Sequence, residues 1–220
     1  MDSDDWLPDR GLETSARYLA QIQGDGRFAG VAGLRDADES HMLWIRGTFE
    51  DGLTEEGKRQ LSKEYVDATS DDYRYRYGIP GDRARIARTD LVQKHPFPVF
   101  AGERFMSEGV LWQRLSDRSY LFREVSQITY CGDCLPDGLL HNASSVYRKS
   151  PRGTACTKND MPSSKKPLGT KPRDAVSYIR YGRAAGMRVD RLISICRKRL
   201  LFLLALPVAL AFPVKKDIGA

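Results

Sequence analysis

The chain has 220 residues, of which 41% are hydrophobic and 10% aromatic, and its formal net charge is +6 at pH 7. This composition is ordinary for a globular protein with one sizeable core, and it excludes a collagen, a coiled coil and a repeat array. The charge is unevenly divided. Residues 1–147 contain 18 basic and 25 acidic residues, whereas residues 148–220 contain 17 and 4. The basic character therefore belongs to the C-terminal third.

The first six residues, Met1-Asp2-Ser3-Asp4-Asp5-Trp6, contain three carboxylates in four positions. Hard oxygen ligands at this short spacing suit Mg²⁺ or Mn²⁺, and such an ion can also hold a substrate diphosphate. The alternative is an acidic, frayed N-terminus that opens a helix, because Asp9 comes just before an apolar pattern of helical period.

The next segments alternate between helix and strand patterns. Residues 10–23 predict an amphipathic helix, which the turn at 24–26 ends with two glycines. Residues 27–34 predict a short apolar strand. Further on, a strand is predicted at 42–45 and a surface helix at 54–65.

Two later segments predict strands. Tyr73–Tyr77 alternates aromatic and basic residues at strand period, a pattern that could stack bases or sugars, or belong to a half-exposed edge strand with its aromatics inward. Residues 83–88 are the other candidate for this position in the sheet. Residues 123–130 predict the last strand, with a loop at 131–138.

A helix is predicted over residues 107–116, where the second group of candidate residues lies. The Ser107 hydroxyl would cap this helix, so Glu108 would fall in the first turn, where the helix dipole favours an ionised carboxylate. That placement suits a general base, although an ordinary acid at a helix start fits the pattern equally well.

The basic C-terminal third begins with a segment that lacks an apolar period. Residues 148–174 are rich in Lys, Pro, Ser and Gly and predict a linker or mobile loop. Residues 175–187 predict a helix.

An apolar block, Leu200–Val214, lies between Arg197-Lys198-Arg199 and Lys215-Lys216. Apolar and basic residues together favour an anionic lipid surface over nucleic acid. The block has 15 residues and two prolines, whereas a spanning helix needs about 20 residues. It therefore predicts a segment lying in the membrane interface, with a buried core helix as the alternative.

Four cysteines complete the set of reactive side chains. Cys131 and Cys134 are close in sequence, and Cys156 and Cys196 lie far from them. A structural zinc site needs more ligands than Cys131, Cys134 and His141 supply. A redox-active Cys-x-x-Cys pair normally opens a helix in a βαβ unit, which this region lacks. We therefore expect all four cysteines to be reduced thiols. Without a secretory signal pattern, a cytoplasmic location is expected.

The run DSDDWLPDRGLETSARYL, residues 2–19, resembles a segment of glycosyltransferase family 2, the inverting sugar transferases with a GT-A fold. In that family a buried strand ends in Asp-Ser-Asp-Asp and is followed by an aromatic residue, a proline and a helix. Later segments resemble the family in the same order: Phe28–Leu34, Gly81–Asp90, Phe97-Pro98, Gly102–Leu115 and Asp137-Gly138-Leu139. The resemblance covers roughly residues 1–150.

The resemblance implies a fold and a domain order. Residues 1–147 would form a partial GT-A (Rossmann-like) α/β domain with a mixed sheet. Residues 148–174 would be a basic linker, and residues 175–220 a helical, membrane-associated tail. Because the family's nucleotide-binding half precedes its Asp-x-Asp motif, the resemblance also implies a truncated form with weak or no activity by itself.

The resemblance further implies roles for the acidic residues of the N-terminal cluster and for those near the start of the helix predicted over 107–116. Asp2 and Asp4 would hold the donor diphosphate through Mg²⁺ or Mn²⁺, with Asp5 also near the metal. The family places a Glu-Asp pair at its later helix start. This chain has Glu108-Gly109 there, so Glu108 would be the base, with Glu103 in reserve.

Trp112, four residues after Glu108, would line the binding site of the acceptor sugar. The alternative is that the Trp112 indole belongs to the hydrophobic core. The implied activity transfers a sugar, with inversion, from a nucleotide-sugar donor to a saccharide or lipid-linked acceptor in cell-surface polysaccharide synthesis. The expected partner is an anionic membrane surface on the inner face of the cell membrane, with no nucleic acid. The alternatives are a non-catalytic remnant and a membrane-surface binding module.

Overall fold

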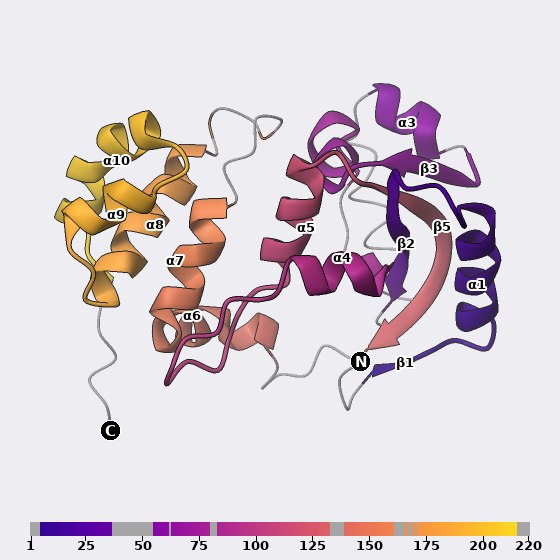
Figure 1. The fold of residues 1–220 in the computed structure, drawn as a ribbon, viewed down its shortest axis with the longest axis horizontal. Coiled ribbons are helices and arrows are strands. Elements are labelled where there is room, and N and C mark those ends of the chain that lie inside the picture. Colours follow the sequence, from indigo (N-terminus) through magenta and orange to yellow (C-terminus); the bar gives the residue numbers. More distant parts are fainter. Residues whose placement is uncertain are drawn as a thin grey trace. The chain divides into compact units, whose positions relative to one another are not determined.

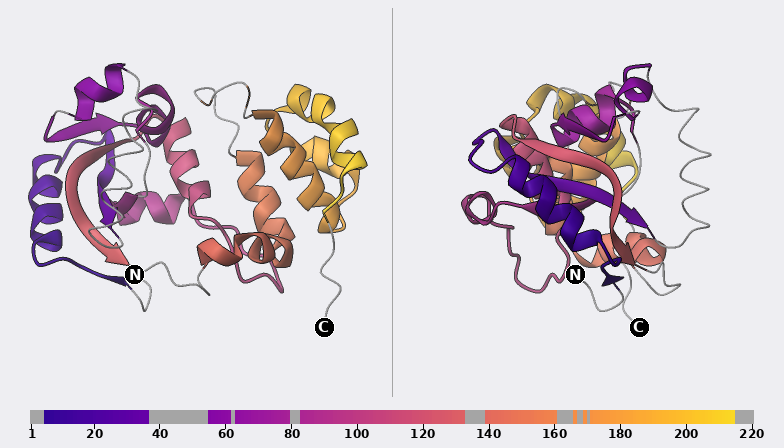
Figure 2. Two further views of the ribbon diagram at one scale, coloured as in Figure 1. Left: turned by 180° about the vertical axis from the view of Figure 1, so that it is seen from behind. Right: turned by 90° about the vertical axis from the view of Figure 1, so that its right-hand side faces the viewer.

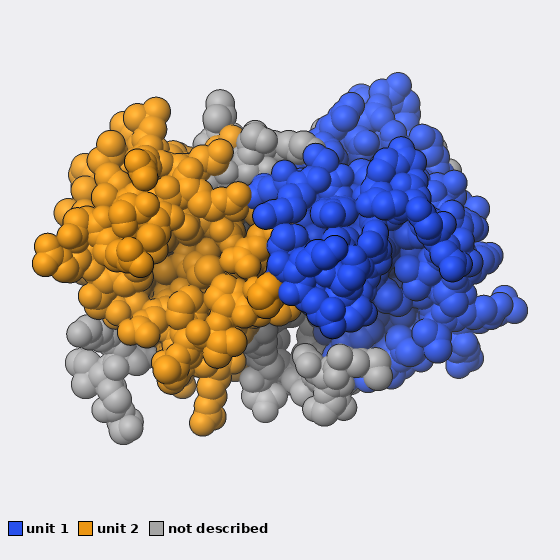
Figure 3. Space-filling view, in the orientation of Figure 1, with its two compact units in different colours: residues 1–95, 115–135 blue, residues 96–114, 136–220 orange. Residues whose placement is uncertain are grey.

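A computed structural model of the chain describes residues 5–36, 55–61, 63–79, 83–132, 139–160, 166, 169 and 171–214. The chain divides into two compact units, coloured separately in Figure 3. Unit 1 comprises residues 1–95 and 115–135, and unit 2 comprises residues 96–114 and 136–220. Unit 2 therefore combines the predicted catalytic helix start with the basic C-terminal third.

Unit 1 is built on a mixed sheet with the strand order β1-β5-β2-β4, in which β3 also pairs with β5 (Figure 1). The strands are β1 (Asp5–Trp6), β2 (Phe28–Asp36), β3 (Tyr65–Ala68), β4 (Arg83–Ala87) and β5 (Leu121–Gly132). β5 runs parallel to β2 and antiparallel to β1 and β3, while β4 is antiparallel to β2. The predicted α/β class with a mixed sheet is confirmed, as are the strands predicted at 27–34, 83–88 and 123–130.

β5 is a long, curved strand that organises the sheet (Figure 2). One of its edges pairs with β2, and its other edge pairs first with β3 and then with β1. The β2 pairing contains register shifts, a feature that accompanies strand bending. At its far end, Gly132 pairs with Asp5 and Cys131 with Trp6. The acidic N-terminal segment thus enters the sheet at the carboxyl end of β5.

Helix α1 (Gly11–Gln21) packs against β2 and β5 and confirms the helix predicted over 10–23 (Figure 1). It buries Tyr18 and Ile22 against Phe28, Val31 and Val125. Two shorter helices, α3 (Glu55–Leu61) and α4 (Thr89–Lys94), also belong to unit 1. The strand predicted at 42–45 lies outside the described residues.

The strand predicted at Tyr73–Tyr77 is wrong, because this segment forms a π-helical turn, η1 (Asp72–Arg76). The Tyr77 amide donates to the Asp72 carbonyl oxygen at 2.9 Å, across five residues. Tyr73 and Tyr77 are both buried, in a cluster with Val66, Ala68 and Ile79. Two aromatics four residues apart share one face of a helical turn, so burial of both tyrosines selects the turn over an alternating strand.

In the part of unit 2 that the structure describes, the regular elements are helices. Helix α5 (Gly109–Asp117) begins in it and confirms the helix predicted over 107–116. The others are α6 (Leu139–Lys149), α7 (Pro151–Asp160), α8 (Lys171–Ala184), α9 (Val189–Ile195) and α10 (Arg199–Ala211). Helix α8 packs against both α7 and α10, and its Tyr178 and Ile179 lie at the centre of a core completed by Leu192 and Phe202.

The linker predicted over 148–174 is wrong for residues 148–149, 151–160 and 171–174, which are helical. The buried face of α7 consists of Gly153, Thr154, Ala155 and Thr157. Small and hydroxylated residues of this kind produce no apolar period in the sequence. The Thr154 and Thr157 hydroxyls donate to the carbonyl oxygens of Ser150 and Gly153 at 2.9 and 3.0 Å, so their burial leaves both hydroxyls satisfied.

The apolar block Leu200–Val214 contains all of α10 except its first residue, Arg199, and this helix buries Phe202, Ala205 and Ala209 in the unit 2 core. The core-helix alternative is therefore correct for one face of this helix. Among the described residues, no helix combines the length and the apolar character needed to cross a bilayer.

Candidate functional site

The predicted metal-binding segment enters the structure at Asp5, whose side chain is 5% exposed. One carboxylate oxygen accepts a hydrogen bond from the Tyr130 hydroxyl, and the other lies 3.6 Å from Arg35 Nη2. Arg35 pairs with Tyr130 in the sheet, and its guanidinium carbon lies 5.9 Å from the Tyr130 ring centroid. β1, β2 and β5 thus each contribute one residue to a charged corner, defined here as Asp5, Arg35 and Tyr130.

Gly132 is the backbone position that makes this corner fit. A Cβ atom built at Gly132 would overlap the Asp5 carboxylate and lie 2.9 Å from Arg35 Nη2. Any larger residue would therefore displace the ion pair. Because Asp5 pairs with Gly132, its carboxylate occupies the space that a Cβ atom at this position of β5 would fill.

The corner bears on the predicted metal site. Since Arg35 and Tyr130 already satisfy the Asp5 carboxylate, Asp5 is better suited to fix the segment than to ligate an ion directly. Asp2 and Asp4 lie outside the described residues. Among the residues that are described, no group of three His, Cys, Asp or Glu side chains could hold a metal ion. The Mg²⁺ or Mn²⁺ site stays a prediction.

Glu108, the predicted base, immediately precedes α5 and is exposed. The Ser107 hydroxyl accepts a hydrogen bond from the Gly109 amide at 3.2 Å, and the Glu108 carbonyl oxygen accepts one from the Leu111 amide at 2.9 Å. The predicted Ser107 cap is confirmed. Glu108 belongs to unit 2 and Asp5 to unit 1, and their convergence on one cleft stays a prediction.

Glu103, the reserve base, caps another helix. Its carboxylate accepts hydrogen bonds from the amides of Arg152 and Gly153, both at 2.8 Å, at the start of α7. Nearby, the Ser150 hydroxyl accepts one from the Phe105 amide at 3.2 Å. A carboxylate in this position satisfies amides that have no partner within the helix and interacts favourably with the helix dipole. The separation of about 50 residues hides this role from the sequence.

Trp112 is half-buried on α5, one turn after Glu108. This position is compatible with either role predicted for the indole, and its contact with an acceptor sugar stays a prediction. The free cysteines include Cys131, Cys156 and Cys196. Burial raises the pKa of the Cys156 and Cys196 thiols, which lowers their reactivity as thiolates. Cys134 lies outside the described residues.

A buried charge cluster in unit 1 was not predicted. Arg83 Nε donates to Glu124 Oε2 at 2.8 Å, and Arg83 Nη2 donates to the carbonyl oxygens of Ala32 and Val125 at 3.1 and 2.8 Å. The Glu124 side chain is 0% exposed, and its Oε1 lies 3.6 Å from Arg85 Nη2. The cluster ties β4 to β5 across β2. Arginines at positions 83 and 85 of a strand share one face, a signal from which this cluster could have been sought.

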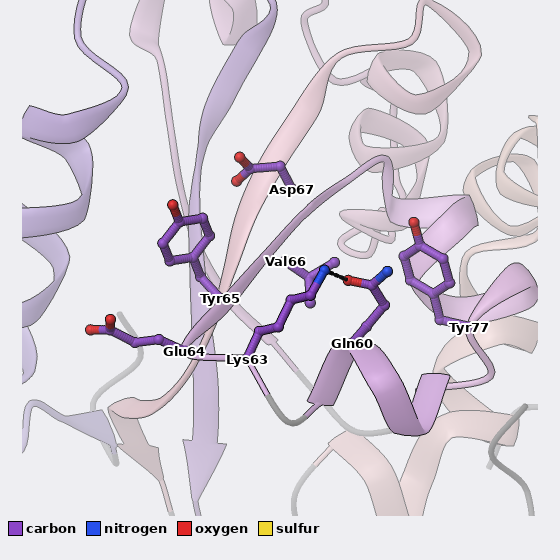
Figure 4. A pocket seen from close by; sticks show the side chains of 7 residues that line it. All are labelled: Gln60, Lys63, Glu64, Tyr65, Val66, Asp67 and Tyr77. Carbon is purple, nitrogen blue, oxygen red and sulfur yellow. Dashed lines mark hydrogen bonds between the residues drawn. The ribbon is translucent and has the colours of Figure 1, made fainter. Parts of the chain in front are cut away.

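A polar hollow of about 520 Å³ lies beside α3 and β3 in unit 1 (Figure 4). Its lining residues are Gln60, Lys63, Glu64, Tyr65, Val66, Asp67 and Tyr77. Its charged groups have partners: Lys63 Nζ donates to Gln60 Oε1 at 3.0 Å, and Asp67 accepts two bonds of 2.8 Å from Arg123. None of the predicted site residues lines this hollow.

Comparison with known proteins leaves the chain unassigned: no protein-family model, no curated protein and no solved structure matches it. The resemblance to glycosyltransferase family 2 therefore rests on the motifs quoted above.

Proposed function

We propose that the chain carries the metal-side and acceptor-side residues of an inverting, family 2 type glycosyltransferase with GT-A architecture. Its substrates are a nucleotide-sugar donor and a saccharide or lipid-linked acceptor, in cell-surface polysaccharide synthesis. The motifs along residues 2–19 and 102–115 are the basis of this assignment.

The observation that carries the proposal is the pairing of Asp5 with Gly132. It places the segment that resembles the family's metal motif at the carboxyl end of β5, just before the segment 137–139 that resembles the family's next loop. Ligands of open α/β sheets bind outside the carboxyl ends of the parallel strands, and β2 and β5 are the parallel pair here. The last residue of the acidic cluster, Asp5, and the last residue of β5, Gly132, are thus neighbours at this edge of the sheet, which supports the proposal.

In this proposal the acidic residues divide the work of donor binding. Asp2 and Asp4 hold the divalent ion, which when bound neutralises charge on the leaving diphosphate. Asp5 is a positioning residue, because its contacts with Arg35 and Tyr130 hold the N-terminal acidic segment at the end of β5.

Glu108 accepts the proton of the acceptor hydroxyl as that oxygen attacks the anomeric carbon, opposite the leaving diphosphate. An exposed carboxylate at a helix start is open to an incoming acceptor, whereas the Glu103 carboxylate is occupied as a cap. Glu108 alone therefore keeps the role of base.

The test measures donor binding and release of nucleoside diphosphate with a panel of nucleotide sugars, Mn²⁺, and saccharide and lipid-linked acceptors. We expect Asp4→Asn to lose metal-dependent donor binding. Because the resemblance implies weak or no transfer by this chain alone, donor binding is its primary readout, and Glu108→Gln should leave donor binding unchanged. In a longer form that also contains the family's nucleotide-binding half, Glu108→Gln should lower transfer by about 10²-fold or more, the usual contribution of a general base.

Glu13→Gln is the matched control, because Glu13 is an exposed acid on α1, and it should leave both readouts unchanged. Failure of every nucleotide sugar to bind, or transfer that survives Glu108→Gln, would contradict the proposal.

A further inference from the structure

Helix α10 has two apolar faces, and only one of them is used by the core. Phe202, Ala205 and Ala209 are buried in unit 2. On the opposite side, Leu200 is 74% exposed and Leu204 70% exposed. Leu203, Val208 and Leu210 extend this exposed face, and together these five residues are called the outer face of α10.

The spacing of these residues shows that the outer face is continuous. Leu200, Leu204 and Val208 recur every four residues and so form one stripe along the helix. Six of the thirteen exposed large apolar side chains among the described residues lie between positions 200 and 212. Soluble proteins rarely present such a concentration to water unless it meets a partner.

The position of α10 within unit 2 is well anchored. The Tyr178 hydroxyl donates to the Leu192 carbonyl oxygen at 2.7 Å, and the Tyr178 ring packs edge-on against Phe202 with centroids 6.0 Å apart. Because Phe202 is 0% exposed, rotating α10 to hide its leucines would expose this core ring. The outer face therefore needs an external partner.

The charge around the helix indicates the chemistry of that partner. Residues 191–216 contain six basic and no acidic residues. Lys198 and Arg199 are exposed at the N-terminal end of α10, while Arg197 lies 3.3 Å from Asp160. A partner that offers an apolar phase next to a negatively charged layer satisfies both features, and an anionic lipid bilayer is such a partner. A second copy of the same face supplies no carboxylate.

The length of α10 fixes how it meets the bilayer. Its 13 residues extend about 20 Å at 1.5 Å per residue, against a hydrocarbon core about 30 Å thick. The helix is thus too short to cross, and its inner face is already occupied by the unit 2 core.

We propose that the outer face of α10 docks unit 2 on an anionic membrane surface. The helix lies in the plane of the bilayer, with Leu200, Leu204 and Val208 below the headgroups and Lys198 and Arg199 at the phosphate level. This inference does not depend on the proposed transferase activity.

The test is co-sedimentation of the full chain with vesicles of phosphatidylcholine alone or mixed equally with phosphatidylglycerol. The chain should bind the mixed vesicles and not the neutral ones. Binding should weaken as salt rises from about 0.1 M to about 1 M, which shortens the Debye length from about 10 to about 3 Å. Lys198→Glu/Arg199→Glu should weaken binding at least tenfold, since each lost charge counts for about fivefold.

The decisive variant is Leu200→Glu/Leu204→Glu, which should reduce binding to mixed vesicles at least tenfold with an unchanged circular dichroism spectrum. Leu12→Glu is the matched control, because Leu12 is 65% exposed on α1 in unit 1, and it should bind like the unchanged chain. In addition, Leu204→Trp should add fluorescence that lipids brominated along their chains quench, whereas Leu12→Trp should not.

Vesicle binding that survives Leu200→Glu/Leu204→Glu would overturn the proposal. It would equally be overturned by a dimer that forms without vesicles, is lost in this variant, and is accompanied by no lipid binding. That outcome would assign the outer face to a second copy of the chain.

Discussion

The Tyr130 hydroxyl donates a hydrogen bond to the Asp5 carboxylate across 125 residues of sequence. Arg35 stands on the other side of the same carboxylate, with Nη2 3.6 Å from Oδ1. A carboxylate this deeply buried is destabilising unless it is paired and hydrogen-bonded. The charged corner therefore fixes the two-residue strand β1 at the end of β5.

Tyr130→Phe removes the donor and leaves the buried carboxylate with Arg35 as its partner. We expect the free energy of unfolding to fall by about 1–3 kcal/mol, the usual cost of removing a hydrogen bond to a charged group. Urea denaturation followed by circular dichroism measures this. Tyr120→Phe, at a half-buried position outside the corner, is the control and should change stability by less. Equal effects of the two substitutions would show that the corner does not stabilise β1.

The Arg83–Glu124 pair predicts strong non-additivity. Arg83→Met leaves the Glu124 carboxylate buried beside Arg85 alone and should destabilise unit 1 by about 3–5 kcal/mol. Arg83→Met/Glu124→Leu removes both charges and should recover part of that loss. A double-mutant cycle in urea gives the coupling energy. A coupling energy near zero would contradict the predicted interaction between Arg83 and Glu124.

Glu103→Ala should destabilise unit 2 by about 1 kcal/mol, because the Arg152 and Gly153 amides lose their shared acceptor. Glu103→Gln keeps one acceptor oxygen and should cost less. Amide hydrogen exchange at residues 152 and 153 reports the cap directly and should accelerate most in the alanine variant. If exchange at these amides is unchanged, the capping role is wrong and Glu103 returns as a candidate base.

Tyr73 makes stability depend on alkaline pH. Burial, the largest cause, raises the pKa of Tyr73 from 10.0 to about 12. The unfolded chain thus releases this proton near pH 10 while the folded chain retains it. The contribution of the Tyr73 phenol to the free energy of unfolding is fully present below pH 10. This contribution is lost as the pH rises toward 12, by up to about 3 kcal/mol.

The measurement compares the urea denaturation midpoint at about pH 9, below this window, with the midpoint at about pH 11, within it. Tyr73→Phe should make the decrease between the two pH values smaller, and Tyr120→Phe should not. An identical decrease in the Tyr73→Phe variant would show that the buried phenol is not its source.

The correct and the incorrect secondary-structure predictions both have physical reasons. The helix over 10–23 was predictable because Leu12, Ala16, Leu19 and Ile22 recur at helical spacing with the glycines of 24–26 after them. The face that is buried differs in part, because Tyr18 is buried and Leu12 is exposed. In α7 the buried face is made of residues such as Gly153 and Thr157, so burial leaves no trace in hydropathy. In the segment Tyr73–Tyr77, periods of two and of four both fit the tyrosines, and only tertiary burial decides between them.

In the candidate site, too, the roles that depend on local sequence were predictable and those that depend on distant segments were not. The Ser107 cap was predictable because a hydroxyl next to a helix start is a local signal. The engagement of Asp5 with Tyr130 and of Glu103 with the α7 amides depends on chain segments far apart in sequence. A single sequence contains no signal for such pairings, so the sequence alone left Asp5 as a metal ligand and Glu103 as a reserve base.

The central claim is that the acidic N-terminal segment binds a metal–diphosphate complex close to the Glu108 base, and paramagnetic Mn²⁺ tests it without requiring turnover. In an NMR titration of the full chain with Mn²⁺ and a nucleoside diphosphate, amide signals of Asp5, Trp6 and Gly132 should broaden together with those of Glu108 and Gly109. Asp4→Asn should abolish all of this broadening. Broadening confined to the end of β5, with the Glu108 signals unaffected, would contradict the shared site.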